Sequence, residues 1–141
     1  AEKWAVEIGG GANHRFGLYD MAMLKDNHID FAGGVAKALK STKSYLKKSK
    51  KKLKIEIEVR SLQELREVIE EGGVDRIMLD NMMPSQIRQG IAMIDGKYET
   101  EASGGITEMS ISEIADTGVD YISVGALTHS YKSLDMSFKA I

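Results

Sequence analysis

The sequence predicts an α/β fold built on a parallel β-sheet, and two patterns indicate it. Short apolar runs of strand length alternate along the chain with longer segments of helical periodicity. Glycine makes up 14 of the 141 residues and tends to follow the short runs, whereas proline occurs once. Such alternation is typical of βαβ units with right-handed crossovers, which give parallel strands.

The individual elements follow from this pattern in chain order. Five short apolar runs predict strands at residues 21–24, 55–59, 76–79, 98–102 and 121–124. Four segments between or after them predict helices at residues 31–46, 61–70, 84–94 and 107–115. Ser61 lies three residues before Glu64, which is the spacing of a capping box and supports a helix start there.

The glycine loops decide between a doubly wound sheet and a barrel. A complete (βα)₈ barrel takes at least ~200 residues, so length alone favours a small doubly wound domain. However, residues 9–14 (GGGANH) match neither nucleotide-binding glycine motif. Ser103-Gly104-Gly105 and Gly125 instead follow the last two predicted strands, where (βα)₈ barrels bind phosphate. We therefore predict that residues 1–141 form the C-terminal part of an incomplete TIM-like barrel with parallel strands.

Composition excludes several classes of function. The 19 basic and 21 acidic side chains leave a net charge of −2, which gives no overall footprint for nucleic acid. No apolar stretch approaches the ~18 residues of a membrane span, so no membrane partner is expected. The chain has no cysteine and hence no disulfide framework or thiolate zinc site. Its start, AEKWAV, lacks the layout of a secretory signal, which predicts a cytoplasmic location.

One stretch departs from this balance, since nine lysines and no acidic residue lie between Lys37 and Lys54. We interpret it mainly as the solvated face of an outer helix, because lysines at helical spacing usually coat barrel helices. The alternative is a surface that binds a polyanion or a partner.

The first candidate site is basic. His14 and Arg15 precede the first predicted strand, and Lys25 follows it within Lys25-Asp26-Asn27-His28. Polar residues at the carboxyl end of a strand face the active-site mouth of a barrel. A guanidinium, an imidazole and an ammonium group would suit a carboxylate or phosphate ligand. The alternative is a salt-bridged loop involving the nearby acidic residues Asp20, Asp26 and Asp30.

The second candidate is a pair of carboxylates, Glu58 and Asp80, on consecutive predicted strands. Strand alternation puts Glu56 and Glu58 on one face, which a barrel would turn inward. A buried charge there must be paired or bind a ligand. Two carboxylates at neighbouring strand ends can bind Mg²⁺ together with a substrate's phosphates, or hydrogen-bond a ribose. The alternative is that Glu58 is a salt-bridge partner of Arg60 or Lys25.

The third candidate comprises Ser103, Gly104 and Gly105 with the Gly125 loop and His129 beyond it. Glycine lets the backbone approach a ligand, and successive N–H groups can bind an anion. A Gly-Gly turn without function is the alternative. The three histidines, His14, His28 and His129, lack the spacing of a zinc site.

Taken in order, these motifs resemble a known family over nearly the whole chain. GGGANHRFGLYDMAMLKDNHI, IEIEV, IMLDNM, EASGGIT, GVDYISVGALTHS and LDMSF are similar to segments of quinolinate phosphoribosyltransferase, the carboxylating nicotinate-nucleotide pyrophosphorylase. The resemblance implies an enzyme of NAD biosynthesis. It would convert quinolinate and 5-phosphoribosyl 1-diphosphate into nicotinate mononucleotide, diphosphate and CO₂ with Mg²⁺, working as a homodimer or larger homo-oligomer.

The resemblance also implies roles for individual residues. His14, Arg15 and Lys25 would hold the dicarboxylate, and Lys25, Glu58 and Asp80 would be catalytic. Glu58 and Asp80 would lie by the ribose and the Mg²⁺–diphosphate. The 5′-phosphate would be bound by Ser103, Gly104, Gly105 and Gly125, with His129 nearby.

The family pattern differs from this chain in two respects. Gly72-Gly73 has one residue more than usual, which we interpret as a longer loop. The family also has an N-terminal α/β sandwich domain, first barrel units with a basic TRKT-type motif, and an arginine lent to the neighbouring subunit. None of these is in the 141 residues, so we predict little or no turnover by this chain alone.

Two other functions are kept as alternatives. One is another phosphate-binding barrel, such as a paralogous group associated with molybdate transport, although the intact Lys25-Asp26-Asn27-His28 speaks against that group. The other is a non-catalytic module that binds partners through the lysine-rich stretch.

Overall fold

The computed structural model describes residues 1–140, which divide into two compact units. The larger unit spans residues 14–124 and holds every strand. The smaller unit combines residues 1–13 with the chain from Gly125 onward.

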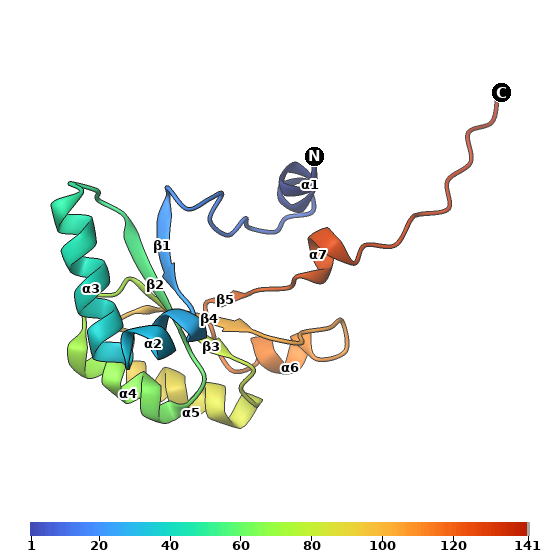
Figure 1. Ribbon diagram of the computed structural model, residues 1–141. Coiled ribbons are helices and arrows are strands. Elements are labelled where there is room, and N and C mark those ends of the chain that lie inside the picture. Colours follow the sequence, from blue (N-terminus) through green and yellow to red (C-terminus); the bar gives the residue numbers. More distant parts are fainter. Residues whose placement is uncertain (141) are drawn as a thin grey trace. The chain divides into compact units, whose positions relative to one another are not determined.

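The larger unit is built on one parallel sheet of five strands (Figure 1). The strands are β1 (Met21–Leu24), β2 (Lys54–Val59), β3 (Arg76–Asp80), β4 (Glu99–Ser103) and β5 (Tyr121–Ile122). Their spatial order is also their chain order, β1-β2-β3-β4-β5, without the reversal that marks a doubly wound sheet. The α/β class with parallel strands is confirmed, and an open sheet in sequential order is consistent with part of a barrel.

Five helices connect or follow these strands: α2 (Asp26–Ala32), α3 (Val35–Lys48), α4 (Leu62–Glu71), α5 (Pro84–Ile94) and α6 (Ile111–Ala115). Each contacts the next, and Figure 1 shows α3, α4 and α5 along the outer side of the sheet. The Ser61 Oγ accepts a hydrogen bond from the Glu64 backbone N–H at 3.1 Å, which confirms the predicted helix start. Pro84 opens α5 at a position where a missing N–H costs nothing.

The prediction of one helix over residues 31–46 was wrong, because two helices occupy this region. Gly33 and Gly34 have φ values of +79° and +118°, which interrupt the helical path between α2 and α3. The predicted helix at residues 107–115 starts later, at Ile111. The preceding residues form a turn in which the Thr107 N–H donates to Ser110 Oγ at 3.0 Å.

Alternation along the strands separates an apolar face from a polar one. The apolar side chains form the core together with the helices, and β2 and β3 contribute the buried residues Ile55, Ile57, Val59, Ile77 and Leu79. The alternate residues of β2, β3 and β4 belong to the opposite face and are mostly polar. They are Glu56, Glu58, Arg76, Asp80, Glu99, Glu101 and Ser103. The sheet thus has a hydrophobic core on one face and a polar face on the other, in which Glu56 and Glu101 are buried.

The smaller unit contains α1 (Glu2–Ile8) and α7 (Ala126–His129), which contact each other. The chain after Ser130 has no helix or strand up to residue 140. In residues 1–140, no helix has the length and apolar character needed to cross a membrane.

Candidate active site

Four of the predicted site residues of the larger unit lie at the carboxyl ends of four neighbouring strands. Lys25 directly follows β1, Glu58 is the penultimate residue of β2, and Asp80 and Ser103 end β3 and β4. Asp80 and Ser103 are directly opposite each other in the parallel register. The fold therefore brings residues from four separate segments to one edge of the sheet, where α/β barrels place their active sites.

Asp80 and Ser103 are joined by a hydrogen bond. The Ser103 Oγ donates to Asp80 Oδ1 at 2.5 Å, and the Asn81 Nδ2 donates to Asp80 Oδ2 at 2.6 Å. The Asn81 backbone N–H also donates to the Ser103 carbonyl at 2.9 Å. Asn81 is one of few non-glycine residues with positive φ, at +52°, a conformation that asparagine tolerates better than most residues. Sequence reasoning did not single out Asn81, whose one signal is its position after the strand ending in Asp80.

Gly104 is required by the same contacts. It has a φ of +93°, and a Cβ there would lie 2.3 Å from Asn81 Oδ1 and 2.8 Å from the Asn81 backbone nitrogen. Gly105 has a φ of +61° and open space around its Cβ position. The loop after β4 thus needs glycine for its backbone conformation, and its backbone is open to a ligand.

Glu58 and Asp80 interact electrostatically. Glu58 is half-buried, and burial followed by the negative charge of Asp80 raises its pKa above the ordinary value of 4.5. Lys25 acts in the opposite direction. The predicted alternative in which Arg60 pairs with Glu58 is not what the structure shows, because Arg60 pairs with Asp30 at 2.9 Å and Glu64 at 2.7 Å.

A divalent cation fits this pair of carboxylates. The negative charge of Asp80 destabilises the charged form of Glu58, and a cation bound between the two carboxylates would relieve this repulsion. Mg²⁺ is commonly held by one or two carboxylates together with substrate phosphates. Glu58 and Asp80 therefore have the chemistry of the predicted magnesium ligands.

Of the three predicted basic site residues, His14 and Arg15 contact the strands β2 and β1. His14 Nε2 lies 2.9 Å from Glu56 Oε2, and Arg15 Nη1 donates to the Met21 carbonyl at 3.2 Å. The Lys25 backbone N–H donates to His28 Nδ1 at 2.9 Å, so His28 helps to start α2. Asp20 accepts the backbone N–H groups of Phe16 and Gly17, and Asp30 pairs with Arg60.

Gly125 and His129 belong to the smaller unit. A Cβ at Gly125 would lie 2.6 Å from His129 Nε2, so the glycine lies under this imidazole ring. Their participation in the phosphate site stays a prediction.

Within residues 1–140, one group of three His, Asp or Glu side chains has ligand atoms within 4.8 Å of one another, namely His14, Glu56 and Glu101. The three histidines accordingly do not form a common site.

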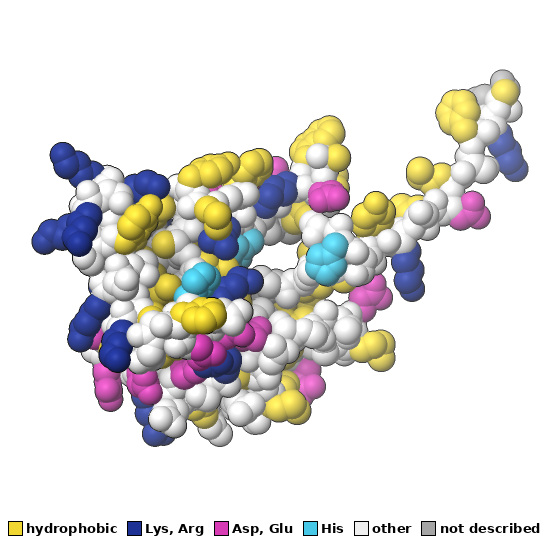
Figure 2. Space-filling view, in the orientation of Figure 1, with side chains coloured by type: hydrophobic (Ala, Val, Ile, Leu, Met, Phe, Trp, Pro, Cys, Tyr) yellow, Lys and Arg dark blue, Asp and Glu magenta, His cyan; other side chains and the backbone are white. Residues whose placement is uncertain are grey.

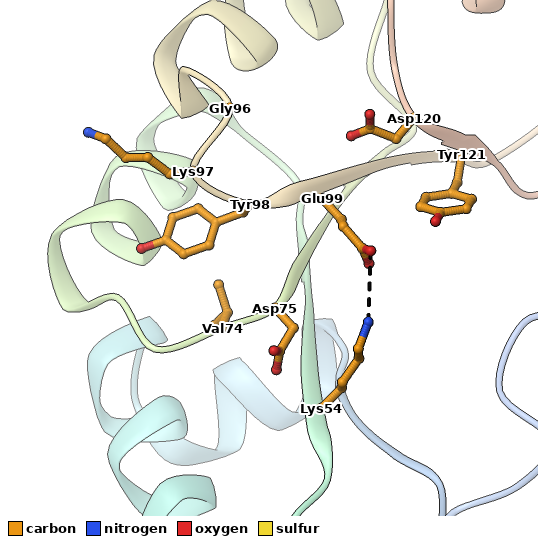
Figure 3. Close-up of a pocket in the computed structure, with 9 residues that line it drawn as sticks. All are labelled: Lys54, Val74, Asp75, Gly96, Lys97, Tyr98, Glu99, Asp120 and Tyr121. Atoms are coloured by element: carbon orange, nitrogen blue, oxygen red, sulfur yellow. Dashed lines mark ion pairs between the residues drawn. The ribbon is translucent and has the colours of Figure 1, made fainter.

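An open cavity of about 540 Å³ lies at the opposite, amino-terminal ends of the strands (Figure 3). Its acidic residues serve the fold. Asp75 Oδ2 accepts the Ile55 N–H at 2.7 Å, Asp120 Oδ2 accepts the Thr100 N–H at 2.8 Å, and Lys54 pairs with Glu99 at 3.8 Å. These contacts explain the polar lining, so we place the candidate active site at the other end of the sheet.

The lysine-rich stretch covers α3 and the loop after it, and Figure 2 shows Lys and Arg side chains gathered at this side of the molecule. Lys40 and Lys43 each lie 3.4 Å from a carboxylate oxygen of Glu71, and Lys43 Nζ also donates to the Gly72 carbonyl at 2.7 Å. These contacts join α3 to the end of α4, which supports the outer-helix interpretation for these two lysines.

The fold and site define an α/β protein whose parallel sheet carries Lys25, Glu58, Asp80 and a Ser-Gly-Gly loop at its carboxyl edge. The sequence profile described as "Quinolinate phosphoribosyl transferase, C-terminal domain" matches residues 1–139. The chain therefore belongs to the quinolinate phosphoribosyltransferase family.

Individual relatives agree with this membership. Quinolinate phosphoribosyltransferase [decarboxylating] 2, mitochondrial, of Nicotiana glauca is 49% identical over 152 residues, covering 98% of this chain and 43% of the relative. The probable nicotinate-nucleotide pyrophosphorylase [carboxylating] of Bacillus subtilis is 47% identical, covering 96% and 46%. The crystal structure of NadC from Streptococcus pyogenes matches with a TM-score of 0.89 and 47% identity, covering 99% and 47%. The chain spans less than half the length of these relatives.

Proposed function

We propose that the protein carrying this chain transfers the phosphoribosyl group of 5-phosphoribosyl 1-diphosphate to quinolinate. Decarboxylation then gives nicotinate mononucleotide, diphosphate and CO₂. The observation that carries the proposal is the order of side chains along one sheet edge in a member of this family. Lys25 follows β1, Glu58 is the penultimate residue of β2, Asp80 ends β3, and the Ser103-Gly104-Gly105 loop begins at the end of β4.

Quinolinate is a dicarboxylate, and His14, Arg15 and Lys25 supply the complementary charge. Guanidinium can bind a carboxylate through two hydrogen bonds, whereas the lysine ammonium acts as a point charge. We assign these three residues to the two carboxylates of quinolinate. We assign Ser103, Gly104 and Gly105 to the 5′-phosphate. The resemblance of the sequence to the family extends this assignment to Gly125 and His129.

Glu58 and Asp80 are the residues that would hold Mg²⁺. When bound, the ion would neutralise the negative charge of the diphosphate leaving group. The two carboxylates also stabilise the positive charge that develops on the ribose as diphosphate departs, because they are fixed before the reaction. Ser103 and Asn81 hold Asp80 in place for this purpose.

Decarboxylation needs little further chemistry from the protein. The pyridine nitrogen attacks the anomeric carbon, and the resulting cationic ring stabilises the electron pair left on C2 when the 2-carboxylate leaves as CO₂. A proton from solvent then binds C2 and gives nicotinate mononucleotide. His14, Arg15 and Lys25 orient the ring so that this bond can break. Proximity and electrostatic stabilisation therefore account for most of the proposed catalysis.

The proposal also covers the longer protein, its oligomeric state and its location. We propose that it is the catalytic barrel part of a longer protein whose N-terminal domain completes the site in a homodimer or larger homo-oligomer. The chain covers 43–47% of the relatives described above, which supports a longer protein. We also propose a cytoplasmic location, although the name of the Nicotiana glauca relative places that protein in mitochondria.

Titration calorimetry of this chain tests the site directly. We expect binding of quinolinate and nicotinate mononucleotide, weakened about tenfold or more in Lys25→Ala, which is about 1.4 kcal/mol. Gly125→Asp should weaken only the mononucleotide, since quinolinate has no phosphate. Lys48→Ala, an exposed lysine of α3, is the matched control.

The outcomes separate the competing functions. Unchanged affinity in Lys25→Ala would contradict the assignment of the dicarboxylate site. Binding of phosphate compounds without quinolinate would favour another phosphate-binding barrel enzyme. We also expect no measurable turnover by the 141-residue chain, and detectable turnover would refute the proposed need for the missing segments.

A further inference from the structure

The polar face of the sheet contains a chain of charged side chains that the proposed reaction does not use. Arg76 on β3 lies between two glutamates of β4, with its guanidinium nitrogens 3.0 Å from Glu99 and 2.9 Å from Glu101. The guanidinium carbon also lies 4.0 Å from the centre of the Tyr121 ring. Ser123 donates a short hydrogen bond to the other carboxylate oxygen of Glu101. Glu101 is thus fixed from two sides.

His14 joins this chain of charges from a loop outside the sheet. Its Nε2 lies 2.9 Å from Glu56 Oε2 and 3.7 Å from Glu101 Oε2. The two glutamate side chains are 0% and 1% exposed, whereas the histidine side chain is 28% exposed. A partly accessible imidazole therefore rests on two buried carboxylates.

The carboxylates of this polar network outnumber the cations that pair with them. Three carboxylates, on Glu56, Glu99 and Glu101, face two permanent cations, Arg76 and Lys54. One of the two oxygens of Glu56, Oε1, has no hydrogen-bond partner in the described part of the chain. A buried carboxylate without compensation is costly, so a protonated His14 supplies charge that this network lacks.

We propose that Glu56 and Glu101 are positioning residues that hold His14 as an imidazolium, with Nε2 on the carboxylates and Nδ1 left to bind a carboxylate of the substrate. Arg76 and Ser123 keep Glu101 in place for this role. This inference rests on the proposed function, because it assumes that His14 contacts the dicarboxylate. It adds residues that contact no substrate and act through the histidine.

The charges around His14 agree with this role. The hydrogen bond to Glu56 and the negative charges of Glu56 and Glu101 raise the pKa of His14 above its ordinary value of 6.5. Burial and the positive charge of Arg76 act in the opposite direction and are outweighed. The histidine therefore keeps its positive charge to higher pH than a free imidazole, which favours carboxylate binding near neutrality.

The first test follows the His14 ring by NMR during a pH titration of the whole 141-residue chain, with signals assigned through His14→Gln. We expect the pKa of His14 to fall in Glu56→Gln and, by a smaller amount, in Glu101→Gln. Glu70→Gln, an exposed glutamate of α4, is the matched control and should leave it unchanged. Ser123→Ala, which only releases Glu101 on one side, gives a milder variant if a glutamine substitution prevents folding.

The second test measures quinolinate affinity at pH 6 and pH 8 for the same variants. From pH 6 to pH 8, the quinolinate affinity of Glu56→Gln should fall about tenfold more than that of the unmodified chain. The reason is that His14 loses its proton at a lower pH in this variant. A merely structural role would lower affinity equally at both pH values.

Three results would overturn the inference. The first is an unchanged His14 pKa in both glutamine variants, and the second is an equal loss of quinolinate affinity at both pH values. The third is binding of Zn²⁺ at micromolar concentration to His14, Glu56 and Glu101, which would make them a metal site. If the unmodified chain fails to bind quinolinate at any pH, the proposed function is contradicted, and the NMR titration alone decides whether Glu56 and Glu101 hold His14.

Discussion

The two ends of the parallel sheet use the same residue types for different purposes. At the amino-terminal ends, Asp75 and Asp120 each accept a backbone N–H from the start of a neighbouring strand, at 2.7 and 2.8 Å. At the carboxyl ends, Glu58 and Asp80 interact unfavourably, because burial and then the negative charge of Asp80 raise the pKa of Glu58. Carboxylates therefore stabilise the fold at one end and are held close together at the other.

This difference shows how the chain separates stability from function. A carboxylate that accepts backbone N–H groups is satisfied by the fold itself, so no ligand is needed. Carboxylates that repel each other are stabilised by a bound cation or a cationic reaction centre. Substitution of Asp75 or Asp120 at the amino-terminal end should therefore lower stability, whereas substitution of Glu58 or Asp80 at the carboxyl end should mainly change ligand binding.

The largest expected effect comes from two glycines, one near each end of β4. In Gly104→Ala the new Cβ would lie 2.8 Å from the Asn81 backbone nitrogen, whereas Gly96→Ala, also at positive φ, meets open space. We expect Gly104→Ala to cost about 3–5 kcal/mol of unfolding free energy through this overlap. Gly96→Ala should cost about 1 kcal/mol for the left-handed backbone alone. Urea unfolding measures both values, and equal costs would show that the loop after β4 adapts freely.

The next largest expected effect is the difference in stability between two aspartate variants, one from each end of the sheet. Asp120 Oδ2 accepts both the N–H and the hydroxyl of buried Thr100, at 2.8 and 2.7 Å. Asp120→Ala leaves these donors without their acceptor and should cost about 2–3 kcal/mol. Asp80→Ala should change stability by less than about 1 kcal/mol, because losing two side-chain hydrogen bonds is offset by relief of the repulsion with Glu58.

Thermal unfolding of the two aspartate variants is the measurement, with nicotinate mononucleotide and Mg²⁺ added in a second series. The ligands should stabilise the Asp120→Ala variant as they do the unmodified chain, and should stabilise Asp80→Ala less. A larger loss of stability in Asp80→Ala than in Asp120→Ala would contradict the division of roles between the two ends.

The strands and the strand-end residues could be predicted from sequence, because alternation and glycine punctuation are local signals. The division of residues 31–46 into two helices was missed, although Gly33-Gly34 was visible in the sequence, since the helical periodicity continues across it. The role of Gly104 also depends on Asn81, a contact between different strand ends. Such contacts follow from sheet register, which residue spacing alone does not give.

The candidate site shows the same limit. The positions of Lys25, Asp80 and Ser103 at the sheet edge were predictable because each follows an apolar run, and that of Glu58 because it lies next to the end of one. The support of His14 by Glu56 was not, because these residues are 42 positions apart and His14 lies outside any strand. The alternation in IEIEV placed Glu56 on the polar face, but its partner became apparent only in three dimensions.

The smallest expected effect is a pH-dependent gain of stability in Glu58→Gln. The pKa of Glu58 is raised in the folded chain, so its protonated form is favoured there, and this contribution is fully present below about pH 4.5 and is lost as pH rises through the folded pKa. At pH 7 the charged carboxylate therefore costs stability, which glutamine avoids. Because Glu58 is only half-buried, solvent screening limits the gain in Tm to about 1–2 °C.

Thermal unfolding of Glu58→Gln in metal-free buffer at pH 4 and pH 7 isolates this effect. The gain should appear at pH 7 and vanish at pH 4, where Glu58 itself is protonated. Glu67→Gln on α4 is the control and should show no comparable dependence. Addition of Mg²⁺ should stabilise the unmodified chain more than the variant, because the ion removes the same repulsion that the substitution removes. A loss of stability at pH 7 would show that Glu58 is already compensated within the fold, and the contrast between the two ends of the sheet would then rest on Asp80 alone.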